Sequence, residues 1–137
     1  MLDELALPLL LAERMEEVRG KTRFQKLLYI FQKRCEERNM GVQIFQYQPY
    51  LYGPFSMELA RTIDNLVHER LLVESSDMTE SGNTVVTYSL APEGKEFLEK
   101  VRKDIQIDNR RLDILNEVVN DCSGLQLTDL VTFAKSL

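Results

Sequence analysis

The residues that could carry out catalysis are few and scattered in this chain of 137 residues. His68 is the only histidine, and a Ser-His-Asp or Cys-His device would have to be built around this one side chain. No serine lies in a glycine-rich elbow, and the six glycines are isolated, so no phosphate-binding loop is present. Carboxylates are paired only as sequence neighbours, such as Glu16 and Glu17, which point apart on a helix. The sequence therefore predicts a protein that is not an enzyme.

The cysteines also point away from a metal centre or a disulfide framework. Cys35 and Cys122 are separated by 87 positions, and no histidine or acid lies at ligand spacing from either of them. We expect both thiols to be reduced and no metal or other cofactor to be bound.

A more promising chemistry is that of a cationic and aromatic binding surface. Between residues 14 and 38 the sequence holds eight basic residues and four acidic ones, although the whole chain has a net charge of −5. On the predicted helix in this stretch, helical spacing places five side chains on or near one flank of the apolar stripe. Such a strip suits an acidic protein partner or a nucleic-acid backbone, whereas the simpler alternative is a solvated helix face. The five residues are Arg23, Lys26, Tyr29, Gln32 and Lys33.

A loop rich in aromatic residues and proline follows at residues 47–55. Its aromatic side chains could form the core of an interface, or could only pin the loop to the helix. We expect the loop to dock against the helix that carries Lys26 and Tyr29, with an extended backbone at the glycine before its second proline. The Lys26 ammonium would then reach solvent or a partner's acid. The predicted loop contacts are Tyr50, Tyr52, Gly53, Pro54 and Phe55.

Periodicity and capping residues predict the elements that position these side chains. Asp108 would either cap a new helix or lie at a kink in a longer one, and the cap is favoured because aspartate prefers that position. The predicted strands are residues 42–47, 71–75 and 84–90, and the last two form a hairpin. The predicted helices are residues 5–19, a helix capped by Thr22 that ends near Asn39, one capped by Ser56 that ends near residue 70, one from Pro92, one over 108–121 and one from Thr128.

This order of elements resembles a winged-helix domain of the α+β class, in which the helix before the hairpin reads DNA. That helix offers Met57, Arg61, Thr62 and Asn65, and arginine and asparagine are good readers of base edges. The predicted wing, residues 75–83, contains two acids and no lysine or arginine. A wing that contacts the DNA backbone needs cations, so DNA is the less favoured partner.

Two motifs support a more specific resemblance. Residues 23–29, Arg-Phe-Gln-Lys-Leu-Leu-Tyr, followed by residues 50–56, Tyr-Leu-Tyr-Gly-Pro-Phe-Ser, resemble the signature of the Panacea domain, also called the SocA-like antitoxin domain. Its small YwgA-like relatives are the most similar. The resemblance implies a winged-helix-like, non-catalytic module for protein interaction, with a protein partner such as a toxin or a protease substrate. A DNA-binding transcription regulator is the alternative.

The remaining expectations concern organisation and location. We expect one domain over residues 1–137, with a core at 1–91 that includes the hairpin at 71–90, and a helical extension at 92–137. The longest apolar run, residues 5–12, is far shorter than the roughly 20 residues of a membrane helix, so we expect a cytoplasmic protein without membrane contact. The apolar C-terminal helices could close on each other within one chain or form a homodimer.

Overall fold

Helices and a small antiparallel sheet make up the structure, a computed structural model that describes residues 2–137. The class is α+β, as the sequence predicts. The helices are α1 (Leu2–Met15), α2 (Lys21–Glu37), α3 (Met57–His68), α4 (Pro92–Val101), α5 (Asn109–Cys122) and α6 (Leu127–Ser136). The strands are β1 (Val18–Arg19), β2 (Leu72–Met78) and β3 (Thr84–Leu90).

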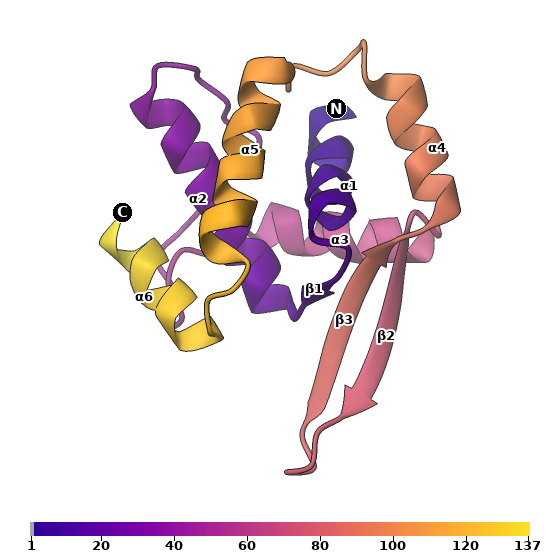
Figure 1. The fold of residues 1–137 in the computed structure, drawn as a ribbon, viewed down its shortest axis with the longest axis vertical. Helices are drawn as coiled ribbons and strands as arrows, with labels where there is room; N and C mark the ends of the chain where they lie inside the picture. The colour runs from indigo at the N-terminus through magenta and orange to yellow at the C-terminus, as the bar shows by residue number, and fades with distance from the viewer. Residues whose placement is uncertain (1) are drawn as a thin grey trace.

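The sheet has the strand order β1-β3-β2, and both pairs are antiparallel. β2 and β3 form the predicted hairpin, which extends away from the helices as a two-stranded ribbon (Figure 1). Only its base is covered by the core. Leu72 and Tyr88 are buried there, and the Tyr88 ring packs edge-on against Phe24 of α2 with 5.5 Å between the ring centroids.

The prediction of a strand at residues 42–47 is wrong. The third strand is β1, which lies inside the segment predicted as the first helix, because α1 already ends at Met15. Val18 and Arg19 pair with Tyr88 and Thr87 of β3. The 42–47 segment has no strand partner, and hydrogen bonds to a helix side chain satisfy part of its backbone instead, as described below.

The core is centred on α1, which contacts α2, α3, α4, α5 and β3 (Figure 1). Every side chain from Ala6 to Ala12 is buried, so this helix is apolar on all sides. Pro8 lies in the helix interior and not in the predicted first turn, because α1 begins at Leu2. No helix of the described residues is long and apolar enough to cross a membrane.

Two of the predicted helix caps are confirmed and one is wrong. Ser56 accepts a hydrogen bond from the backbone N–H of Leu59 and caps α3. Asp108 likewise caps α5 by accepting from the N–H of Arg111, so a new helix begins there. Thr22 does not cap α2, because that helix begins at Lys21, so Thr22 lies inside it and Gly20 is the N-cap.

The C-terminal helices α5 and α6 pack on the N-terminal part of the chain. α5 contacts α1 and α2, and α6 contacts α2. Leu115, Val118, Leu130 and Ala134 are buried within this single chain. The apolar spacing that suggested a homodimer is thus largely covered by α1 and α2, and the homodimer stays a prediction.

Ion pairs across the contact between α2 and α5 join arginines of the basic stretch, residues 14–38, to acidic residues of α5. Arg34 lies 3.2 Å from a carboxylate oxygen of Glu117 and 2.8 Å from one of Asp121. Arg38 donates a 2.9 Å hydrogen bond to Glu117, which raises the pKa of the guanidinium and lowers that of the carboxyl. These two arginines are therefore engaged within the chain and are not free for a nucleic acid.

The start of α4 depends on a residue without a side chain. A Cβ at Gly94 would lie 2.2 Å from the backbone oxygen of Leu71 and 2.7 Å from a methyl carbon of Leu90. Gly94→Ala should therefore destabilise the fold by about 1–3 kcal/mol, the usual cost of overpacking. A Cβ at Gly124 would have no neighbour within 4 Å, so Gly124→Ala is the matched control. Urea unfolding measures both, and equal midpoints would contradict this account.

Candidate protein-interaction site

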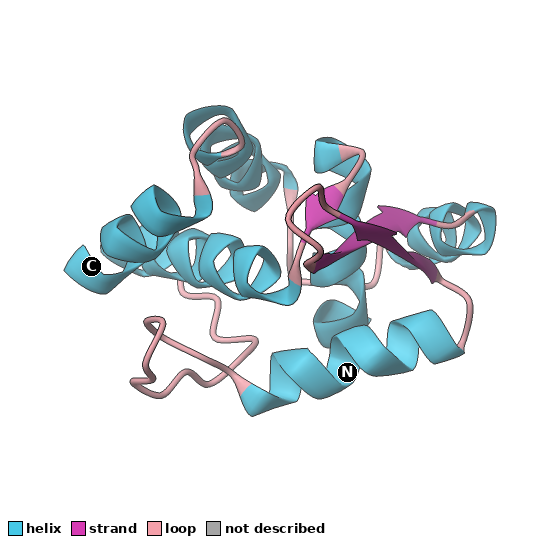
Figure 2. Cartoon of the chain, turned by 90° about the horizontal axis from the view of Figure 1, so that it is seen from below, coloured by secondary structure: helices cyan, strands magenta, loops and turns pink. Residues whose placement is uncertain are grey.

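One face of α2 is polar and carries the irregular segment between α2 and α3. Gln25, Tyr29 and Gln32 lie on this face, since positions four and seven residues apart share a side of a helix. The segment leaves the end of α2 and runs back beside the same helix to the start of α3 (Figure 2). Its backbone has few partners in regular structure, so its N–H and C=O groups must be satisfied by side chains.

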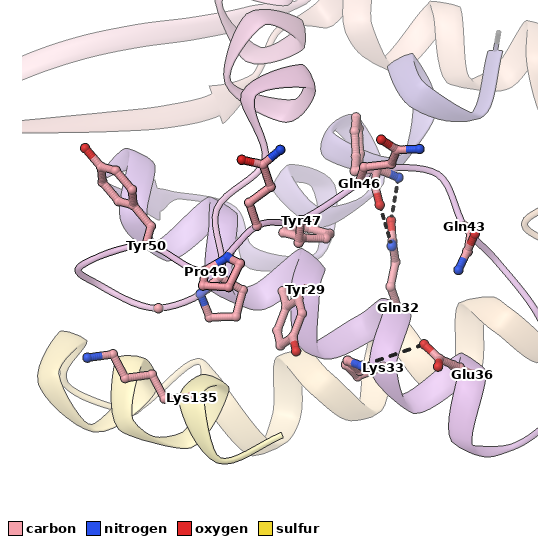
Figure 3. Close-up of a pocket in the computed structure, with 14 residues that line it drawn as sticks. Tyr29, Gln32, Lys33, Glu36, Gln43, Gln46, Tyr47, Pro49, Tyr50 and Lys135 are labelled. Atoms are coloured by element: carbon pink, nitrogen blue, oxygen red, sulfur yellow. Dashed lines mark hydrogen bonds and ion pairs between the residues drawn. The ribbon is translucent and has the colours of Figure 1, made fainter.

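Two buried glutamines of α2 supply those partners. The Gln32 amide donates to the carbonyl oxygen of Phe45 at 3.0 Å and accepts from the N–H of the same residue at 2.8 Å (Figure 3). The Gln25 amide likewise donates to the carbonyl oxygen of Ser56 and accepts from the Ser56 N–H, and both hydrogen bonds are 2.8 Å long. Each side-chain amide therefore makes the pair of backbone hydrogen bonds that a neighbouring β-strand would otherwise make. Together the two pairs hold the segment near its start and at its end.

Lys26 holds the loop between these two anchor points. Its ammonium donates a 2.8 Å hydrogen bond to the carbonyl oxygen of Pro54, and the residue is only 2% exposed. The predicted docking of the loop on the Lys26 helix is thus confirmed for Gly53 and Pro54, but it is wrong for Tyr52, which is 63% exposed. The expectation that Lys26 reaches solvent or a partner's acid is wrong, because the loop itself covers the side chain.

Gly53 allows this close docking. A Cβ at this position would lie 3.2 Å from Cε of Lys26 and 3.4 Å from Cγ of Lys135. Its φ is +94°, a conformation that L residues with side chains rarely adopt, so the predicted extended backbone is wrong at this residue. Glycine is required here for its conformation as well as for its small size.

The loop closes on itself and presents an apolar tip. Gln48 and Phe55 exchange two backbone hydrogen bonds, of 2.8 and 2.9 Å, and the N–H of Gly53 donates to the carbonyl oxygen of Tyr50. The three residues at the tip, Tyr50, Leu51 and Tyr52, are 60%, 77% and 63% exposed. Three consecutive large apolar residues in water, on a loop fixed at its base, are unusual for a surface without a partner.

A groove of about 800 Å³ lies beside this loop (Figure 3). Its floor includes the rings of Tyr29 and Tyr47, which pack edge-on with 5.0 Å between their centroids. The Tyr47 hydroxyl is buried and has no hydrogen-bond partner among residues 2–137, and burial raises its pKa. The lining residues are Tyr29, Gln32, Lys33, Glu36, Gln43, Phe45, Gln46, Tyr47, Gln48, Pro49, Tyr50, Gly53, Pro54 and Lys135.

Most of the predicted partner-binding residues meet at this place. Tyr29, Gln32, Lys33, Tyr50, Gly53 and Pro54 line the groove, Lys26 lies under the loop, and Tyr52 is at its tip. The Phe55 ring packs on Tyr50 with 5.3 Å between centroids and lines a smaller hollow on the other side of the loop. Arg23 lies apart from them, because its guanidinium donates to the carbonyl oxygen of Leu125.

The residues proposed for DNA reading are less well placed. Met57, Arg61 and Asn65 are exposed on α3, whereas Thr62 is buried and unable to reach a base. Glu58 and Asp64 are also exposed on this helix. In addition, no lysine or arginine occurs between residues 71 and 94, so the hairpin has no cation for a phosphate.

Several contributors to the site were not predicted from the sequence, among them Gln25, Gln43 and Lys135. Gln25 could have been found, because it lies seven residues before Gln32 on the same helix face. Lys135 and Gln43 could not, because only the packing of α6 on α2 and the path of the 42–47 segment bring them to the groove.

The single histidine and the two cysteines do not line the groove. No group of three or more histidine, cysteine and acidic residues within the described part of the chain could hold a metal ion. His68 is exposed at the end of α3. Both cysteines are buried, and burial raises the pKa of the Cys35 thiol to about 11, far from that of a reactive thiolate.

Comparison with known proteins adds no assignment to this geometry. No family model matches the chain, and no curated protein sequence matches it either.

The glutamine pairs give a direct prediction about stability. Gln25→Met keeps the volume of the side chain but leaves the buried N–H and C=O of Ser56 without partners, so it should cost about 3 kcal/mol of unfolding free energy. Gln43 is exposed and its side chain makes no hydrogen bond to the described residues, so Gln43→Met is the control, with a change within about 0.5 kcal/mol. Chemical denaturation compares them. A neutral Gln25→Met would mean that water replaces the amide.

The buried lysine gives a prediction about titration. Burial, and then the nearby charge of Lys135, lower the pKa of Lys26. Removing that charge with Lys135→Gln should raise the Lys26 pKa, and Lys95→Gln on the distant helix α4 should leave it unchanged. NMR of the lysine side chains follows each titration separately. Equal Lys26 values in both variants would contradict the predicted proximity.

The same lowered pKa has a consequence for stability. The pKa of Lys26 is lower in the folded chain than in the unfolded chain. At pH values between the two, the unfolded chain binds more protons than the folded chain, so the contribution of Lys26 to the free energy of unfolding rises with pH.

Proposed function

We propose that this protein is a non-catalytic protein-interaction module that binds its partner through the loop of residues 48–55 and the groove beside it. One observation carries the proposal. Tyr50, Leu51 and Tyr52 stand in solvent on a loop that Gln25, Lys26 and the Gln48–Phe55 pair hold in place. Aromatic and large apolar residues on a rigid support bind with little loss of conformational entropy.

The motifs that resemble the Panacea domain support the same proposal. The Gln-Lys-Leu string of α2 and the Tyr-Gly-Pro string of the loop meet in space through Lys26, Gly53 and Pro54. The order α1, β1, α2, α3, β2, β3 is compatible with a winged-helix-like fold. A role as an antitoxin or adaptor that binds a toxin or a protease substrate in the cytoplasm belongs to this proposal.

DNA binding by a transcription regulator is the alternative, and the structure supports it less. Arg61 and Asn65 are exposed, but the acids Glu58 and Asp64 are exposed on the same helix. Arg34 and Arg38, which could have bound phosphates, are paired with α5.

Site-specific photo-crosslinking in the source cells tests the proposal. A photoreactive residue at position 51 should form a discrete adduct with a protein. The matched control is position 78 on the hairpin, because Leu51 and Met78 are both 77% exposed. The proposal fails if position 51 gives no protein adduct, or gives the same adducts as position 78. A nucleic-acid adduct from position 61 would favour the DNA-binding alternative.

A pair of substitutions provides the corresponding affinity test. Leu51→Ser and Met78→Ser should each change the unfolding free energy by less than about 0.5 kcal/mol, since both side chains are in water. Only Leu51→Ser should weaken capture of the crosslinked protein.

A further inference from the structure

We propose that the groove binds an extended acidic segment of the partner protein, with its carboxylates against Lys33 and Lys135. This inference rests on the proposed function and adds the chemistry of the segment that the groove accepts. The two lysines come from different helices, α2 and α6, and both line the groove (Figure 3).

The first argument is the charge that the groove leaves unbalanced. Among its 14 lining residues, Glu36 is the one acid, and its carboxylate lies 3.9 Å from the Lys33 ammonium, at the limit of an ion pair. Lys135 is exposed and makes no ion pair with the described residues. The groove thus has a positive charge, whereas the whole chain has a net charge of −5.

The second argument is the buried ammonium under the loop. Lysines this deeply buried are almost always paired with an acid, but Lys26 has no ion-pair partner among the described residues. Its ammonium can donate three hydrogen bonds, and the structure gives it one, to a neutral carbonyl group. The stem of Lys135 lies beside the same glycine, and the Lys135 charge helps to lower the pKa of Lys26, so the two ammonium groups repel each other. A carboxylate bound at Lys135 would relieve this repulsion.

The third argument is the rest of the lining, which fits a peptide. The exposed amides of Gln43, Gln46 and Gln48 can each donate and accept, so they can pair with the backbone of an extended chain. The tyrosine floor offers contact for side chains between the acids, and Lys33 lies 5.8 Å from the centroid of the Tyr29 ring. The volume of about 800 Å³ is within the range of ligand sites, roughly 300–1,000 Å³.

A nucleic acid fits the groove less well than an acidic peptide. Phosphate-driven binding needs a continuous run of cations, and α2 contributes only Lys33 here because Arg34 and Arg38 are paired with Glu117 and Asp121. The loop of residues 47–55 beside the groove also has no lysine or arginine for a sugar-phosphate backbone.

NMR titration of the isotope-labelled protein tests the inference. The probe is a capped peptide of about eight residues in which glutamate alternates with valine, and the matched peptide has glutamine in place of glutamate. The acidic peptide should shift the amide signals of groove residues and bind more weakly as salt rises. The glutamine peptide should bind at least severalfold more weakly. A DNA duplex serves as the competing probe.

Two surface variants assign the effect to the lysines. The double variant Lys33→Gln with Lys135→Gln should weaken the acidic peptide by roughly tenfold, since exposed charge pairs contribute up to about 1 kcal/mol each. The double variant Lys21→Gln with Lys95→Gln has the same change in charge and should bind as the parent does. The spectra themselves report whether each variant is folded.

The inference would be overturned if the acidic peptide at millimolar concentration shifted no amide signal of the groove, or if the glutamine peptide bound as tightly as the acidic one. It would also be overturned if both double variants weakened binding of the acidic peptide equally. Groove shifts with the DNA duplex that exceed those with the peptide would also overturn it. Any of these results, together with a protein adduct at position 51, would leave the proposed function standing. An acidic peptide in the groove without such an adduct would contradict the proposed function, and the peptide site in the groove would stand without it.

Discussion

The hydrogen bonds from the side-chain amides of α2 to the backbone of the following segment are the constraint on which the rest of the site depends. This segment contains two prolines and two glycines and has no neighbouring strand, yet its buried N–H and C=O groups must be paired. Gln25 and Gln32 pair them two at a time, at Ser56 and Phe45. Because both ends are held on one helix face, the loop tip stays at a defined height above it.

The packing of this segment and of α5 on α2 determines the partners of the charged residues of α2. Lys26 is covered by the loop that it holds, while Arg34 and Arg38 point to the acids of α5. Lys33 and Lys135 line the groove, and we propose them as the charges that bind a partner. Within the basic stretch, Lys26 thus anchors the loop, Arg34 and Arg38 pair with α5, and Lys33 contributes charge to the groove.

The two candidate binding regions differ in how they are supported. The loop of residues 48–55 is fixed by contacts with α2, and its apolar tip is exposed without being free to collapse onto the core. The hairpin is a ribbon with one covered end, and its exposed residues are mostly polar or acidic, with Val73 and Met78 as exposed apolar side chains among them. Preorganisation lowers the entropic cost of binding, so it favours the loop over the hairpin as the contact region.

The sequence by itself determined the α+β class, the β2–β3 hairpin, the caps at Ser56 and Asp108, and the meeting of the loop with α2. These follow from local periodicity, capping chemistry and proline stiffness, which act over a few residues. Only the tertiary structure decided that Lys26 is buried, that the third strand is Val18–Arg19, and that Lys135 joins the groove. Each of these depends on a partner far along the chain. Val18 pairs with Tyr88, and Lys135 arrives because α6 packs on α2. Local patterns carry no information about such distant neighbours.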